Sequence, residues 1–155
     1  MKKALALLLA AAVLLSLAGC GGKAEPAAAP VDLNALYESY GEQLPDMFFP
    51  DEATLLNFLG IELADCAQSV VAICADGMRT DEVWLIEAKD EEALQRLTAL
   101  AQTRLQAKAD ETVSYAPDQY AVVEKAELLT SGLYLALLVS PEVETLKAGF
   151  EAAVG

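Results

Sequence analysis

The chain has 155 residues and a formal net charge of −14 at pH 7, from 24 acidic and 10 basic residues. Nucleic-acid binding depends on lysine and arginine that neutralise phosphates, so this charge argues against a nucleic-acid partner. The sequence contains no histidine, which excludes Ser-His-Asp and Cys-His catalytic groups. We therefore expect no catalytic residue, no cofactor and no bound metal.

Residues 1–19 have the features of a secretory signal peptide. Lys2 and Lys3 form a positive start, and residues 4–16 are apolar and uncharged. This run is too short for a membrane-spanning helix, which needs about 20 apolar residues. We expect residues 1–19 to be removed from the mature protein.

The next motif, Leu-Ala-Gly-Cys at 17–20, resembles the lipobox of bacterial lipoproteins. The resemblance implies cleavage between Gly19 and Cys20 and attachment of lipid to the Cys20 thiol. Two acyl chains give stable anchoring, so the membrane would be the first partner and the domain would lie at the extracytoplasmic face. The alternative is an ordinary signal peptide followed by a chance cysteine.

Residues 20–30 predict the lipidated cysteine and a flexible tether, because two glycines and two prolines prevent a stable helix or strand. Residues 31–155 then form a single domain. This length suffices for one core and leaves little room for the two lobes of a solute-binding protein.

The domain begins with two short helices and continues with a hairpin. Asp32 suits the N-cap of a helix over 33–43, and a second short helix follows over 52–59. Strands over 69–75 and 82–88 are then joined by a turn.

A long helix over 91–109 follows the first hairpin, and its basic residues Arg104 and Lys108 suit the negative end of the helix dipole. A short helix over 117–123 comes next. The second hairpin joins strands over 127–130 and 133–140, and a last helix over 141–153 begins at a proline.

This order predicts an α+β fold with a four-stranded antiparallel sheet in ββα-ββα order, helices packed on it and two short helices before it. Two strands, over 70–74 and 133–139, are apolar on both faces, so we expect them to be central and covered on both sides. We expect both long helices on one face. The other face would be covered by the helices over 33–43 and 52–59, by a partner, or by a second copy.

From Leu55 onward the layout resembles a bacterial lipoprotein domain, the domain of unknown function 4358. The matching residues, in chain order, are Leu59-Gly60-Ile61, Asp81-Glu82-Val83, Lys89-Asp90, Tyr115-Ala116-Pro117-Asp118-Gln119-Tyr120 and Gly132-Leu133-Tyr134. The resemblance implies an anchored extracytoplasmic domain. It brings no known activity, substrate or site residues.

Cys66 and Cys74 are eight residues apart. On one extended strand their Cα atoms would be about 26 Å apart, whereas a disulfide needs about 4.4–6.8 Å. Unless a bend separates them, we predict two free, buried thiols.

The first hairpin holds the candidate interaction residues. Asp76, Arg79, Asp81 and Glu82 crowd its turn, where they form either a cation-attracting surface or a solvated turn with a local ion pair. The aromatic residues Trp84 and Tyr115 either line a ligand surface or, as we favour, pack over the sheet and its crossing loop.

Together these features favour a non-enzymatic, membrane-anchored module that presents its domain to a protein or small-molecule partner at the cell surface. The expected contact surface is the sheet face opposite the long helices or the hairpin over 76–82. One alternative is a cell-envelope hydrolase that uses two carboxylates, which would need them to converge in a cleft. A structural or inhibitor-like domain is the other.

Overall fold

The computed structural model describes residues 30–155, of which Val31–Gly155 form one compact unit. The predicted signal peptide, the lipidation site Cys20 and the tether up to residue 29 lie outside the described residues.

Five antiparallel strands form a single sheet. In chain order they are β1 (Met47–Phe48), β2 (Cys66–Cys74), β3 (Glu82–Ala88), β4 (Glu127–Ser131) and β5 (Tyr134–Val139). Their order in space is β1-β2-β3-β5-β4. The predicted α+β class with an antiparallel sheet is confirmed, but the sheet has five strands and not four.

The additional strand, β1, lies in the segment that the sequence predicts as a break between two helices. It pairs with the end of β2, Met47 with Cys74 and Phe48 with Ile73. Two residues are too few to show the alternation by which a strand is recognised. The start of β2 is missed for a related reason, because an irregularity between Cys66 and Gln68 interrupts its alternation.

The helices follow the prediction closely. They are α2 (Leu33–Tyr40), α3 (Glu52–Thr54), α4 (Glu91–Thr112), α5 (Pro117–Val123) and α6 (Val143–Val154). A π-helical turn, Leu55–Leu59, continues α3 and ends at Gly60, which has a left-handed backbone with φ of 74°. No helix among residues 30–155 is long and apolar enough to cross a membrane.

Side-chain caps explain where these helices begin. The carboxylates of Asp32, Asp51 and Asp90 each accept hydrogen bonds from backbone N–H groups in the first turn of α2, α3 and α4. The last helix starts two residues later than predicted. There the Ser140 hydroxyl accepts from the backbone N–H of Glu142, so Pro141 lies in a turn before α6.

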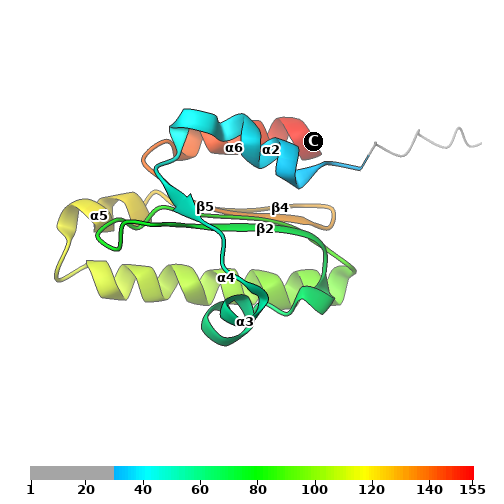
Figure 1. Ribbon diagram of the computed structural model, residues 1–155, viewed down its shortest axis with the longest axis horizontal. Coiled ribbons are helices and arrows are strands. Elements are labelled where there is room, and N and C mark those ends of the chain that lie inside the picture. The colour runs from blue at the N-terminus through cyan, green and yellow to red at the C-terminus, as the bar shows by residue number, and fades with distance from the viewer. Residues whose placement is uncertain (1–29) are drawn as a thin grey trace, which may run out of the picture. The chain divides into compact units, whose positions relative to one another are not determined.

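The domain has three layers, with helices on both faces of the sheet (Figure 1). Helices α2 and α6 cover one face, while α4, α3 and the turn Leu55–Leu59 cover the other. The expectation that both long helices share a face is therefore wrong. Because the central strands are apolar on both sides, each face needs a substantial helix to exclude water from it.

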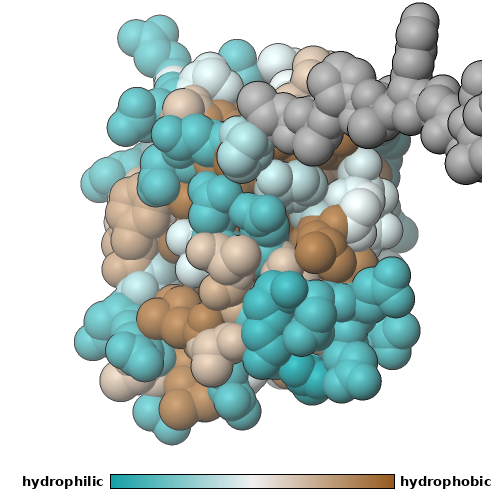
Figure 2. Space-filling model, turned by 90° about the vertical axis from the view of Figure 1, so that its right-hand side faces the viewer, coloured by the Kyte–Doolittle hydropathy of each residue, from teal (hydrophilic) through white to brown (hydrophobic). Residues whose placement is uncertain are grey.

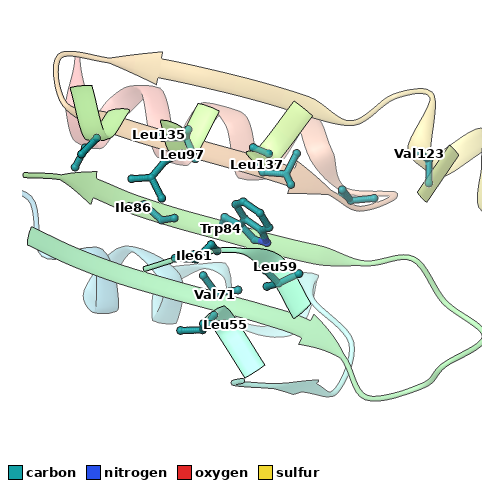
Figure 3. Close-up of a cluster of buried hydrophobic side chains, with 14 residues drawn as sticks. Leu55, Leu59, Ile61, Val71, Trp84, Ile86, Leu97, Val123, Leu135 and Leu137 are labelled. Atoms are coloured by element: carbon teal, nitrogen blue, oxygen red, sulfur yellow. The ribbon is translucent and has the colours of Figure 1, made fainter. Parts of the chain in front are cut away.

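Two buried clusters, one on each face, form the core. The α4 side is centred on the indole of Trp84, which lies between Leu59, Val71 and Leu137 (Figure 3). On the α6 side, Phe150 and its neighbours pack against the opposite face of β3 and β5. The prediction that the strands over 70–74 and 133–139 are central and covered on both sides is confirmed, since neither β2 nor β5 is an edge strand and both are mostly buried over these residues.

Both remaining cysteines are free, at opposite ends of β2, and Cys74 is buried while Cys66 is partly buried. Burial raises the pKa of the Cys66 thiol to about 11, and the neighbouring Asp65 carboxylate adds to this effect. In a Cys20→Ser variant we expect both thiols to react slowly with a disulfide reagent at pH 8, Cys66 because its raised pKa makes the reactive thiolate scarce and Cys74 because its side chain is buried. In denaturant without reductant, both should react quickly.

This thiol prediction is measured by the absorbance of the released reagent, with Cys74→Ser as a one-thiol control. A denatured protein that releases no reagent signal until a reductant is added would contradict it.

Candidate functional site

The acidic side chains of the first hairpin do not all point to the same face of the sheet. Asp81 and Glu82 are adjacent in sequence, so their side chains point to opposite faces. Asp81 is buried and paired with Arg79, whose Nε lies 3.0 Å from Oδ2 of Asp81. Asp76 remains exposed in the turn and accepts from the backbone N–H of Met78. Of the hypothesis of a solvated turn with a local ion pair, the ion pair is present between Arg79 and Asp81 and Asp76 is exposed, but Asp81 and Glu82 are buried and not solvated.

Glu82 lies at the centre of a buried ion cluster under α4. Its Oε2 is 2.8 Å from both Nη2 of Arg104 and Nζ of Lys108. Its Oε1 accepts from the indole Nε1 of Trp84 at 2.8 Å. The carboxylate is completely buried, and two cations and one neutral donor satisfy it.

The cluster keeps Glu82 ionised. Burial on its own would raise the pKa of this carboxyl, but the hydrogen bond from Arg104 and the charge of Lys108 outweigh burial and lower the pKa below its ordinary value of 4.5. A carboxylate that stays charged in this way is a poor general acid near neutral pH.

The two cations of the cluster keep donors free for another group. The Lys108 ammonium donates to Glu82 and to the backbone carbonyl of Thr80, at 3.0 Å for the latter, which uses two of its three hydrogens. Arg104 binds Glu82 through Nε and Nη2 only. Its Nη1 makes no hydrogen bond with the residues that the structure describes, and the guanidinium lies 5.1 Å from the ring centroid of Phe58.

These two cations open into a cavity of about 560 Å³ between the β2–β3 turn, the second half of α4 and the start of α5. We call it the hairpin cavity. The side-chain amide of Gln119 on α5 accepts hydrogen bonds from both the backbone N–H and the hydroxyl of Thr80, and so fixes the turn against α5. The volume lies within the usual range of small-molecule sites, about 300–1,000 Å³.

Exposed apolar side chains surround the hairpin cavity. Tyr115 is 90% exposed and Met78 80%, while Phe58 and Phe48 are 64% and 45% exposed. They come from four separate segments of the chain: the loop after α4, the β2–β3 turn, the π-helical turn and β1. Large apolar groups that gather from distant segments around one hollow are typical of a binding surface.

The opposite end of the domain, where α4 begins, has a different surface. Figure 2 shows hydrophilic residues over most of this end, with small hydrophobic areas between them. A second hollow of about 340 Å³ lies beside the π-helical turn and is lined by residues that include Leu56 and Leu63. It lacks the aromatic side chains and buried cations of the hairpin cavity.

The structure places the candidate residues from the sequence analysis in different surroundings. Arg79 and Tyr115 line the hairpin cavity. Glu82 lies beneath it, bonded to two lining residues. Trp84 is completely buried in the core, so its predicted packing role is confirmed. The same prediction is wrong for Tyr115, which follows the end of α4 and points into solvent.

Arg104 and Lys108 are the site residues that the sequence analysis missed. They were expected at the helix end, interacting with its dipole. Their spacing from Leu97 and Ala101 places them on the buried stripe of α4, where a charged side chain needs a buried partner. Glu82 is the acidic residue on the α4-facing side of β3, two positions before Trp84. The helical period of α4 and the two-residue alternation of β3, taken together, predict the ion cluster.

The described residues do not offer a set of donors for a metal ion. Within residues 30–155, the structure contains no group of three or more cysteine, aspartate or glutamate side chains arranged to hold a metal ion. The acidic residues Asp76, Asp81 and Glu82 do not converge, because they point into solvent, to the α6 side and to the α4 side, respectively.

A protein-family model, domain of unknown function 4358 (DUF4358), matches residues 41–140. The chain belongs to this family. No curated protein matches the chain, and no solved structure matches it. The match confirms the resemblance noted in the sequence, and it begins earlier than Leu55, where that resemblance starts.

The DUF4358 segment contains all five strands, α3, α4 and α5. It also contains every residue that lines the hairpin cavity, from Phe48 to Gln119. Helices α2 and α6, which cover the other face of the sheet, lie outside the matched segment. The cavity is thus a feature of the DUF4358 part of the chain.

Proposed function

We propose that this protein is a lipid-anchored, extracytoplasmic binding module without catalytic activity, and that the hairpin cavity is its binding surface. The observation that carries the binding role is the ring of exposed aromatic and methionine side chains around a hollow with buried cations in its wall. The anchor is supported by the signal-peptide pattern and the lipobox that ends at Cys20.

The geometry gives less support to the hydrolase alternative. A two-carboxylate mechanism needs facing acids, one with a raised pKa. Here the pKa of Glu82 is lowered, and its carboxylate is occupied by Arg104, Lys108 and Trp84. The neighbouring Asp81 is buried on the other face and paired with Arg79. A binding role uses the same groups without a free acid or base.

The binding role is tested with the full-length lipoprotein purified in detergent. It is exposed to a small-molecule extract of bacterial envelopes, washed, and analysed by mass spectrometry for retained compounds. We expect one or more compounds to be retained by the wild type and lost in Phe58→Ala. The matched control is Leu56→Ala, since Leu56 is exposed on the same π-helical turn but does not line the cavity. Equal retention by both variants would count against the cavity as the binding surface.

The anchor makes a separate prediction. In a bacterial host, wild-type protein should appear in the membrane fraction and partition into the detergent-rich phase, with its intact mass starting at a lipidated Cys20. Cys20→Ser should remove the thiol that accepts the lipid, so at least about 90% of the protein should leave the detergent phase. Gel analysis of the two phases measures this, with Cys66→Ser as the control. Unchanged partition of Cys20→Ser would disprove the anchor.

A further inference from the structure

The hairpin cavity gathers positive charge in a strongly acidic chain. Three of the seven lysines and arginines in residues 30–155, namely Arg79, Arg104 and Lys108, line it, together with one carboxylate, Glu111. The carboxylates that partner these cations, Asp81 and Glu82, are buried behind them and do not line the cavity. The cavity wall therefore presents cations, while their counter-charges lie in the protein interior.

The buried cluster also has an unequal charge. Arg104 and Lys108 carry two positive charges against the single carboxylate of Glu82, so the cluster by itself has a net charge of +1, and the other carboxylate at the cavity, Glu111, is exposed. Among the described residues, no buried side-chain nitrogen or oxygen lacks a partner, so the unbonded Nη1 of Arg104 is open to solvent. This guanidinium side chain is only partly exposed and Lys108 is buried. An anion that enters the cavity would meet these donors in a partly desolvated site, where attraction between charges is stronger than in bulk water.

We infer that the hairpin cavity binds a small organic monoanion, a carboxylate attached to an apolar or aromatic body. The carboxylate would lie against Nη1 of Arg104 and the third hydrogen of Lys108, since a planar guanidinium suits a planar carboxylate. The apolar body would contact Phe48, Phe58 and Tyr115. The net charge of +1 on the buried cluster matches a monoanion better than a phosphate dianion. This inference rests on the proposed binding role and specifies its ligand class.

The test uses three probes with one naphthyl body and different heads: 4-(1-naphthyl)butyrate, its primary amide and the corresponding butylamine. Binding to the full-length lipoprotein in detergent is measured by ligand-observed NMR and by naphthyl fluorescence at low salt. We expect the carboxylate to bind at least tenfold more tightly than the amide, and the amine to bind more weakly than the amide. Raising the salt concentration should weaken only the carboxylate.

Two variants locate the site. Tyr115→Ala should weaken the carboxylate and the amide by a similar factor of about five, because it removes contact with the shared body. Arg104→Gln should weaken the carboxylate at least fivefold and leave the amide unchanged, and circular dichroism checks that this variant folds. Val113→Ala is the control, because Val113 is exposed near the end of α4 but does not line the cavity.

The outcomes separate the two proposals. If the amide or the amine binds as tightly as the carboxylate and Tyr115→Ala weakens it, the cavity is a binding surface but the anionic ligand class is wrong. If Tyr115→Ala and Val113→Ala affect every probe equally, the probes bind elsewhere and the inference fails. If no probe binds and no envelope compound is retained, the proposed function fails with it.

Discussion

Replacing Glu82 by glutamine should lower the free energy of unfolding by about 3–5 kcal/mol, the cost of removing one partner of a buried ion pair. The change leaves the partly exposed Arg104 and the buried Lys108 on α4 without a neutralising charge, and Lys108 is too enclosed to be hydrated in place. It also exchanges a carboxylate oxygen for an amide N–H that faces their donors. Urea unfolding followed by tryptophan fluorescence measures the loss.

Two further variants make this prediction specific. Glu111→Gln removes an exposed carboxylate from the same stretch of α4 and should change the stability by less than about 0.5 kcal/mol. The triple variant Glu82→Leu, Arg104→Leu, Lys108→Met removes all three charges together and should recover most of the loss, because apolar replacement of a whole buried cluster is often neutral or stabilising. A Glu82→Gln protein as stable as the wild type would show that the cluster does not form.

The same cluster predicts a dependence of stability on pH. The pKa of Glu82 is lower in the folded protein than its ordinary value of 4.5, so the unfolded state binds the proton first. The contribution of Glu82 is therefore complete above about pH 5 and is lost as the pH falls through the folded-state pKa. The wild type should lose stability in this acidic window more steeply than the triple variant. Parallel slopes for the two proteins would contradict this assignment.

Replacing Trp84 by alanine should cost about 3–5 kcal/mol, the usual range for removing a large aromatic side chain from a packed core. The indole is completely buried among residues of β2, β5 and the π-helical turn. Its Nε1 also donates to Glu82, so the change leaves a void and removes one donor from the ion cluster. Because α4 and the turn Leu55–Leu59 both pack against the hydrophobic cluster around Trp84, we expect unfolding to become less cooperative as well.

Thermal unfolding followed by circular dichroism measures the effect of Trp84→Ala. Two control variants separate the contribution of packing from that of the indole hydrogen bond and from the effect of a surface change. Trp84→Phe keeps most of the volume and loses the indole donor, so its cost should be well under half that of alanine. Tyr115→Ala, at a position 90% exposed, should alter stability by less than about 0.5 kcal/mol. A loss for Trp84→Phe as large as that for Trp84→Ala would mean that the hydrogen bond, and not the packing, dominates.

Local patterns predict most of the fold because each depends on neighbouring residues. Asp32, Asp51 and Asp90 mark three helix starts through caps that lie within one turn, and the alternation along β3 places Trp84, Ile86 and Ala88 on one face of the strand, which packs against α4. Strand β1 is not predicted, because it forms only through pairing with Ile73 and Cys74, which are distant in the sequence. The side on which α6 packs is also a long-range property, and one helix sequence cannot specify it.

The candidate site was predictable only in part for the same reason. Arg79 and Tyr115 stand out as a charge in a turn and an aromatic in a loop. The cavity itself needs Phe48, Phe58 and the β2–β3 turn to meet, although they are far apart in the sequence. The ion cluster lies between these cases, because the buried position of Glu82 on its strand and that of Arg104 and Lys108 on their helix can each be inferred from periodicity.

Helices α2 and α6 contact each other, although one precedes and the other follows the segment that matches the family. The Tyr40 hydroxyl donates to the carbonyl of Leu146 at 3.0 Å, and both helices cover Val70, Val83, Leu85 and Leu138. A fragment cut at residues 41 and 140 would keep every cavity residue yet expose this whole apolar sheet face to water. We therefore expect the family segment expressed alone to aggregate, and biochemical work on the cavity to need helices α2 and α6 as well.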